Sequence, residues 1–192
     1  RFDSVAGVEP QSETNWGYAD EAGVPRICFI NKMDRLGASF EKSYASILDR
    51  LSKKAVRIQL PWGAADQLKG VVDLVRMKAF VFEGEMGMTV IEVEIPDELL
   101  AEAKEARAEL VERVVEHDDV LMEAYLAGTE PTHDELKATL RKAVLANQLF
   151  PVMTGSALKN IGVQLVLDGV VDYLPAPTDL PPVKGINPKD DS

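Results

Sequence analysis

Two short polar stretches, far apart in the chain, contain residue types that could do chemistry. The first is Asn31-Lys32-Met33-Asp34 and the second is Gly155-Ser156-Ala157-Leu158-Lys159. Each follows an apolar run rich in β-branched residues, 26–30 in the first case and 149–154 in the second, which predicts a strand. Because open α/β sheets bind ligands at the carboxyl ends of their strands, we expect the two stretches to form one site.

The first stretch has the residue types needed to recognise guanine. Guanine presents N1–H and its exocyclic amine side by side, and the carboxylate of Asp34 can accept hydrogen bonds from both. Adenine offers no such pair of donors, and a buried carboxylate left unpaired is costly, so this discrimination is strong. Asn31 is expected to tie the loop and approach the base edge. The aliphatic stem of Lys32 is expected to cover one face of the base.

The second stretch is expected to complete the guanine site. The backbone N–H groups of Ala157 and Leu158 would donate to the guanine carbonyl oxygen, Ser156 would brace the turn, and Lys159 would cover the opposite face of the base. Taken alone, the first stretch could be a solvated turn and the second could be the start of a helix. Their order, and the strand before each of them, favour the guanine site.

The sequence contains no Gly-x-x-x-x-Gly-Lys-Ser/Thr, the glycine-rich loop that holds nucleotide phosphates. Two Asp-x-x-Gly matches begin at Asp20 and Asp34, but neither follows a phosphate loop, and we interpret both as chance. We therefore expect the polypeptide alone to show no GTPase activity, and we assign no catalytic residue and no metal ligand.

Several longer segments support a family resemblance; they span residues 2–14, 23–38, 69–75, 155–160 and 173–177. With these segments the chain resembles the elongation factor G family, the bacterial translocation GTPases of the ribosome. The first segment is specific to that family and its close relatives, which include ribosomal-protection proteins. Gly17-Tyr18 and Trp62 depart from the family pattern without touching the predicted guanine-binding residues.

The resemblance implies a fold and a function. The fold is α/β, the C-terminal half of a doubly wound P-loop-GTPase-like sheet, interrupted by an α+β insert subdomain. The phosphate loop and switch segments would lie upstream of Arg1, and further domains would lie beyond Ser192. The protein would bind GTP or GDP, with Mg²⁺ only in the full-length parent, and would drive tRNA–mRNA movement on the ribosome in the cytoplasm.

The pattern along the chain predicts four parts: residues 1–55 and 149–175 as the doubly wound half, 56–148 as the insert, and 176–192 as a proline-rich linker. In the doubly wound half we expect a strand end at 1–5, helices at 10–22, 39–53 and 162–174, and strands at 26–30 and 150–154. The helix at 39–53 has an apolar stripe that includes either Tyr44 or Ala45.

In the insert, residues 70–83 and 88–95 are β-rich and are joined by a turn at 83–87. The inward face of 88–95 stays open, because Val90 and Val93 belong to opposite alternating sets. A long helix is predicted after Pro96, and its expected inner stripe is Leu99, Ala103, Ala106, Leu110 and Val114. Thr132-x-x-Glu135 is a capping-box pattern that predicts a further helix, with Leu136, Leu140 and Val144 inward.

The outer face of the long predicted helix is strongly acidic. Its glutamates are Glu98, Glu102, Glu105, Glu109, Glu112 and Glu116. One interpretation is a solvated face. In the family's insert the same stripe would dock a lysine-bearing partner, the ribosomal stalk protein, with Glu105, Glu109 and Glu112 as candidate contacts. The alternative function is therefore a non-enzymatic acidic interaction module. A third interpretation, a generic α/β domain with no nucleotide role, would require both loop motifs to be coincidences.

Composition limits other functions. The formal net charge is −11 and the pI is about 4.7, which argues against direct nucleic-acid binding by this chain. The single cysteine, Cys28, lies in an apolar strand and is expected to be a core residue. His117 and His133 lack neighbours at ligand spacing, and Asp118-Asp119 is interpreted as a loose turn. No apolar run is long enough to span a membrane, and we expect no signal peptide.

Overall fold

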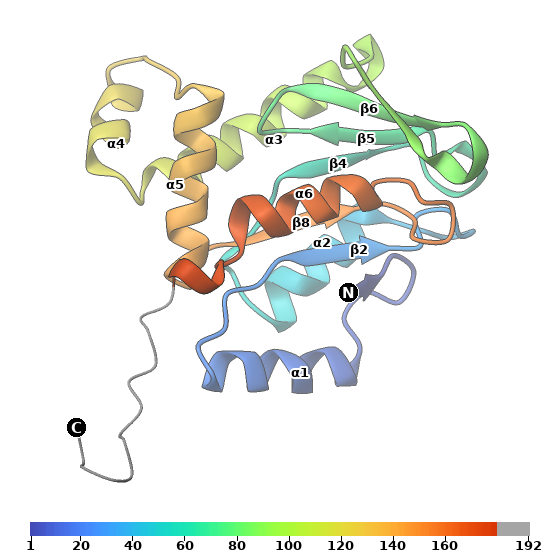
Figure 1. Ribbon diagram of the computed structural model, residues 1–192, viewed down its shortest axis with the longest axis horizontal. Helices are drawn as coiled ribbons and strands as arrows, with labels where there is room; N and C mark the ends of the chain where they lie inside the picture. Colours follow the sequence, from blue (N-terminus) through green and yellow to red (C-terminus); the bar gives the residue numbers. More distant parts are fainter. Residues whose placement is uncertain (180–192) are drawn as a thin grey trace, which may run out of the picture.

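The computed structural model describes residues 1–179 and contains a four-stranded parallel sheet. Its strands are β1 (Phe2–Asp3), β2 (Cys28–Asn31), β8 (Phe150–Thr154) and β3 (Ala55–Arg57), in the spatial order β1-β2-β8-β3 (Figure 1). All neighbouring pairs are parallel. Every residue of β8 is buried, as expected of a central strand covered on both faces.

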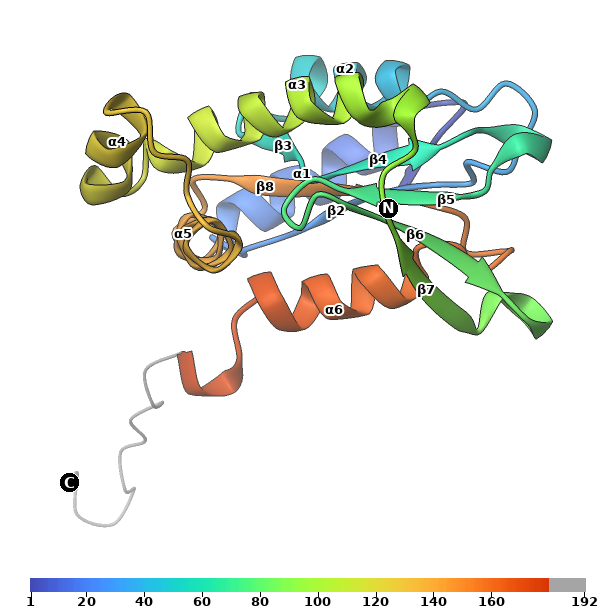
Figure 2. The same cartoon turned by 90° about the horizontal axis from the view of Figure 1, so that it is seen from above.

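Three helices belong to this sheet: α1 (Pro10–Glu21), α2 (Phe40–Arg50) and α6 (Val163–Tyr173). Viewed from above, α2 and α6 lie on opposite sides of the strands (Figure 2). Trp16 of α1 packs edge-on against Phe150, with ring centroids 5.0 Å apart. The predicted α/β class is therefore confirmed, and each predicted helix is found within three residues of its expected ends.

The insert forms a second, antiparallel sheet in the order β4-β5-β6-β7. Its strands are β4 (Gln59–Trp62), β5 (Gly70–Asp73), β6 (Lys78–Glu83) and β7 (Thr89–Val93). The short 3₁₀ turns η1 (Ala65–Gln67) and η2 (Glu85–Gly87) lie in the β4–β5 and β6–β7 connections. The inward face of the 88–95 segment is now settled, because Ile91, Val93 and Ile95 are the less exposed set.

The helices of the insert are α3 (Asp97–Val115), α4 (Asp119–Leu126) and α5 (His133–Leu145). The predicted inner stripe of α3 is buried from Ala103 to Val114, and Leu99 is partly buried. The capping box of α5 is present: the Thr132 Oγ1 accepts from the Glu135 N–H, and the Glu135 carboxylate accepts from the Thr132 N–H.

Two sequence interpretations of the insert were wrong. The Asp118-Asp119 pair is not a loose turn, because the Asp118 carboxylate caps α4 by accepting from the Val120 and Leu121 N–H groups. The predicted boundary at residue 56 also divides β3, which lies entirely in the parallel sheet. The pattern of apolar residues around β3 did not identify it as a member of that sheet, because its partner, β8, is about 95 residues away in the chain.

Two neighbouring residues, Ile58 and Gln59, join the two sheets. The Ile58 N–H donates to the Val152 carbonyl of β8 at 3.0 Å, and the Ile58 carbonyl accepts from the Leu74 N–H at 2.9 Å, just after β5. Gln59, the first residue of β4, accepts from the Thr154 N–H through its side-chain oxygen at 3.1 Å. One continuous hydrophobic core therefore extends through both lobes.

Of the predicted linker, Pro177–Asp179 form the 3₁₀ turn η3, and residues 180–192 lie outside the described part. Within residues 1–179, none of the helices is both long and apolar enough to cross a membrane.

Candidate functional site

The first loop, residues 31–34, follows β2 and is held by the end of β1. Lys32 has a left-handed backbone (φ 66°). The Ser4 hydroxyl donates to the Lys32 carbonyl at 2.7 Å, and the Lys32 ammonium lies 2.6 Å from the Asp3 carboxylate. This lysine hydrogen bond, with further bonds from the Val5 and Ala6 N–H groups, lowers the pKa of Asp3 to about 2.

The second loop, residues 155–159, follows β8 and is closed by its own backbone. Ser156 and Ile161 exchange two N–H···O bonds, each 2.9 Å long. A methyl group at Gly155 would lie 2.2 Å from the Ile161 carbonyl oxygen, so only glycine fits this tight turn. Leu158 at the tip is 80% exposed, and Lys159 is exposed beside it.

Three hydrogen bonds join the first loop to the second. The Ser156 hydroxyl donates to Asp34 Oδ1 at 2.5 Å, and the Ala157 N–H donates to Asn31 Oδ1 at 2.9 Å. The Met33 N–H donates to the Gly155 carbonyl at 3.1 Å. The Ser156 oxygen also accepts from the Lys159 N–H at 3.2 Å. The structure thus brings all seven predicted guanine-binding positions into two connected loops at one edge of the parallel sheet.

The arrangement changes one expected role. The Ala157 N–H, predicted to face a ligand, donates instead to Asn31. Within residues 1–179, the Leu158 N–H has no protein acceptor, so it is the amide available to a carbonyl oxygen. Asp34 is half-buried and uses only Oδ1 in the Ser156 bond. A carboxylate oxygen has two lone pairs, so Asp34 keeps acceptor capacity on both oxygens.

Sequence reasoning missed Asp3, Ser4 and Ala65 as members of this site. Asp3 and Ser4 could have been found, because Asp3 ends β1, which neighbours β2 in the parallel sheet, and Ser4 follows it directly. Ala65 comes from the insert, and its N–H donates to the Met33 carbonyl at 2.7 Å. No local pattern indicates that contact.

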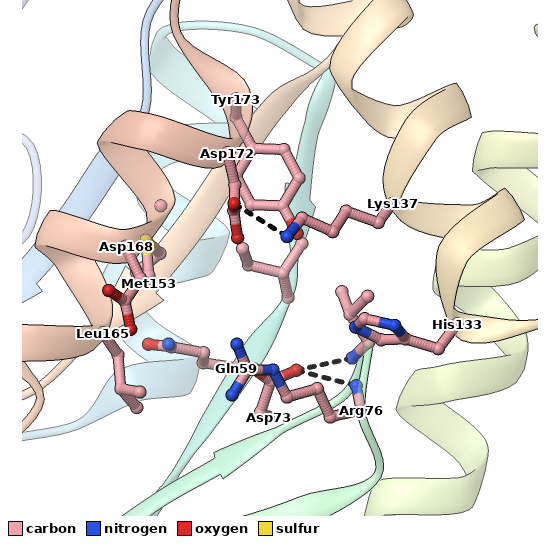
Figure 3. Close-up of a pocket in the computed structure, with 13 residues that line it drawn as sticks. Gln59, Asp73, Arg76, His133, Lys137, Met153, Leu165, Asp168, Asp172 and Tyr173 are labelled. Carbon is pink, nitrogen blue, oxygen red and sulfur yellow. Dashed lines mark hydrogen bonds and ion pairs between the residues drawn. The ribbon is translucent and has the colours of Figure 1, made fainter.

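A separate polar cavity lies where the insert meets α6 (Figure 3). Lys137 of α5 pairs with Asp172 of α6 at 2.7 Å, and burial raises the pKa values of Asp73 and Tyr173. Its volume is about 20 Å³, which suits about one water molecule. This cavity is too small for a nucleoside and lies away from the two loops. Among the described residues, no group of three or more His, Cys, Asp and Glu could hold a metal ion.

The acidic stripe on α3 is exposed along its whole length. Glu109 is nevertheless engaged, because its carboxylate lies 2.6 Å from Arg57 of β3, which also contacts Glu41 of α2. The expectation that the whole stripe is free for a partner is therefore corrected at Glu109. Among residues 1–179, Glu105 and Glu112 have no ion-pair partner.

Comparisons with known proteins agree with this geometry. Residues 2–176 match the family described as Elongation factor Tu GTP binding domain. The chain is also similar to a crystal structure of a protein from Thermus thermophilus, with a TM-score of 0.82 and 30% sequence identity. That match covers 93% of this chain and 26% of the other, so this chain spans about a quarter of the length of the protein it matches.

Proposed function

Because the chain belongs to the elongation factor Tu GTP binding domain family, we propose that it is the guanine-recognising part, with its insert, of a ribosomal translocation GTPase of the elongation factor G type. GTP hydrolysis and tRNA–mRNA movement are proposed for a longer protein that contains this chain, working in the cytoplasm. The family accounts for the guanine nucleotide and the role in translation. The resemblance of the segments described above supports the finer assignment to elongation factor G.

The observation that carries the proposal is the hydrogen bond between Ser156 and Asp34. It joins two loops that are 122 residues apart in the chain and holds the carboxylate in one orientation. Positioned donors and acceptors discriminate strongly between ligands, because a ligand without the matching groups leaves them unpaired. Asp34 would accept from guanine N1–H and the exocyclic amine, and the Leu158 N–H would donate to the carbonyl oxygen.

The remaining residues of the site would act around the base. Asn31 holds the second loop through Ala157 rather than serving only as a base contact. Lys32 is tied to Asp3 at its ammonium, which leaves its aliphatic stem to cover one face of the base. Lys159, exposed on the second loop, would cover the other face.

The test is whether the chain distinguishes nucleosides without the help of phosphates. Guanosine, adenosine and inosine are titrated into the ¹⁵N-labelled protein, and backbone amide shifts are followed at Leu158, Asn31 and a remote control, Thr132. We expect guanosine to shift Leu158 and Asn31 at lower concentration than inosine, which lacks the exocyclic amine, while adenosine leaves them unchanged. Equal responses to guanosine and adenosine would contradict the proposal.

A second candidate function rests on the acidic stripe of α3. Its exposed glutamates present one sign of charge, which speeds encounter with a basic surface and makes the contact sensitive to salt. We propose that this face docks on the ribosomal stalk protein. The stripe supports protein docking and gives no support to direct nucleic-acid binding, since the chain has a formal net charge of −11.

A further inference from the structure

The antiparallel order of the insert sheet brings two of its turns to the same end. The connection from β4 to β5 and the connection from β6 to β7 both lie at this end, and the connection from β5 to β6 lies at the other. In both ribbon views this end of the insert sheet lies beside the loops that follow β2 and β8 (Figures 1 and 2). Each turn contacts one of the two loops of the proposed guanine site.

The turn after β4 holds the first loop. Ala65 has a left-handed backbone (φ 55°) and donates its N–H to the Met33 carbonyl at 2.7 Å. Met33 is itself buried and donates its own N–H to Gly155 of the second loop. The N–H and the carbonyl of Met33 are therefore both hydrogen-bonded, to Gly155 of the second loop and to Ala65 of the insert.

The turn after β6 packs against the second loop and is bonded to the helix that follows it, α6. The Gly87 carbonyl accepts from the side-chain amide of Gln164, in the first turn of α6, at 3.1 Å. Gly87 has a φ of 63°, and a methyl group there would lie 3.0 Å from the Lys159 carbonyl oxygen and 3.4 Å from that of Asn160. The backbone of the insert thus packs directly on the loop that presents the Leu158 N–H.

We propose that the insert positions both loops of the guanine site, with Ala65 and Gly87 as the positioning residues, so that guanine affinity depends on the geometry of the insert turns. This inference rests on the proposed guanine recognition and adds a second role to the insert besides partner docking. Because binding linkage is reciprocal, a guanine nucleotide must then stabilise the same turns that position its loops.

A matched pair of glycine variants tests the positioning. Gly87→Ala places a methyl group against the second loop, whereas Gly84→Ala, in the same turn and with a similar φ of 78°, places it only near the Thr89 side chain. Gly84 adopts φ 78° and ψ −174°, a conformation essentially restricted to glycine, so Gly84→Ala is at least as strained as Gly87→Ala and controls for backbone strain. We expect Gly87→Ala to weaken guanosine binding about tenfold and Gly84→Ala to change it by less than about twofold. The readout is titration of the amide shifts, and thermal unfolding checks that the two variants are similarly stable.

The ligand-free spectra separate failure of this inference from failure of the proposed function. Gly87→Ala should move the amide signal of Leu158 without any nucleoside, and Gly84→Ala should leave it in place. If both variants bind guanosine equally well and keep the Leu158 signal, the positioning role is overturned while guanine recognition stands. If the unmodified protein fails to distinguish guanosine from adenosine, the proposed function itself is overturned.

A measurement on the unmodified protein covers the case in which Gly87→Ala does not fold. The Ala65 N–H is followed by hydrogen exchange with and without saturating GDP. Exchange at Ala65 should slow by a larger factor than at the remote Leu136 N–H of α5, which reports global stabilisation, since the bond to Met33 would then open less often. An exchange rate at Ala65 that is the same with and without GDP would overturn the coupling.

Gln164→Leu, which removes the donor to Gly87, should reduce guanosine affinity in the same direction as Gly87→Ala.

Discussion

The hydrogen bond from Ser156 engages Oδ1 of Asp34 and leaves Oδ2 for a ligand. The Ser156 hydroxyl donates to Oδ1 at 2.5 Å, so an asparagine at position 34 would keep its oxygen toward Ser156 and turn its amide toward the ligand. The Ser156 oxygen already accepts from the Lys159 N–H at 3.2 Å, which favours the hydroxyl donating rather than accepting toward position 34. An asparagine at position 34 is therefore biased toward this orientation before a ligand binds.

Asp34→Asn should reverse the preference of the site from guanine to xanthine. The outward amide donates to the 2-oxygen of xanthine, whereas it meets the exocyclic amine of guanine with a second donor. Guanosine and xanthosine affinities are compared by amide-shift titration, and we expect the ratio to change by at least about a hundredfold, as for other lost hydrogen-bond pairs. Asp34→Ala is the control and should bind both weakly. A variant that retains guanosine preference would remove Asp34 from the proposed role.

Asp3 gives the protein a stability term that depends on pH. The Lys32 hydrogen bond lowers the pKa of Asp3 from 3.8 to about 2 in the folded protein, and its side chain is only 12% exposed. A lowered folded-state pKa stabilises the fold above the unfolded-state pKa, and this contribution is lost as pH falls from about 4 to about 2. At neutral pH the contribution is on the order of 2 kcal/mol.

Asp3→Asn isolates that term. The amide oxygen can still accept from the Val5 and Ala6 N–H groups, but the charge opposite Lys32 is gone. Urea unfolding should show a free energy of unfolding lower by about 2 kcal/mol near pH 6, with the difference shrinking toward pH 2.5. A difference that stays constant over this range would show that the ion pair is not its source. Asp49→Asn, at an exposed pair on α2, provides the comparison with a surface ion pair.

At the scale of elements, α3 has one buried and one exposed face. Its apolar face is buried against the rest of the insert, and Arg107 from its flank donates to the carbonyls of Leu74 and Val75 at 2.7 Å. Its acidic face is exposed but not uniform, because Glu109 is tied to Arg57 while Glu105 and Glu112 are not. A docking test must therefore leave Glu109 in place, since changing it would also disturb the contact between α3 and β3.

The double variant Glu105→Lys/Glu112→Lys should weaken binding to the ribosomal stalk protein. The loss should be about tenfold or more at low salt and should diminish as salt is added, because exposed charges are screened over roughly 10 Å at 0.1 M. Affinity is measured by calorimetry with the isolated stalk protein at two salt concentrations. Glu123→Lys, on exposed α4 outside the stripe, adds positive charge elsewhere and is the control. Unchanged affinity at low salt would leave the stripe as a solvated face.

At the scale of the whole molecule, the two lobes should unfold together. They share one hydrophobic core, and Ile58 bonds to both sheets. Each lobe also carries its own tryptophan, Trp16 on α1 beside β8 and Trp62 on β4 of the insert. A cooperative domain gives coincident transitions by different probes.

Two single-tryptophan variants test this cooperativity. Trp62→Phe leaves the fluorescence of Trp16, and Trp16→Phe leaves that of Trp62. In each variant the urea transition by fluorescence should coincide with that by far-ultraviolet circular dichroism. A fluorescence midpoint of Trp62 well below the circular-dichroism midpoint would mean that the insert unfolds by itself. Saturating guanosine should raise both midpoints, since a ligand that binds only the folded state stabilises it.

The sequence by itself determined most of the elements and the candidate loops, because these depend on neighbours along the chain. It did not predict β3, β4 or α4. Apolar runs followed by polar loops, the Thr132–Glu135 capping box and the stripe of α3 are all local patterns. Tertiary structure alone decided which atoms meet. It assigned the Ala157 N–H to Asn31, paired β3 with β8, tied Glu109 to Arg57 and placed insert turns against both loops. Partners in such contacts lie tens to more than a hundred residues apart, and they are selected by packing of the whole fold rather than by any periodicity within one segment.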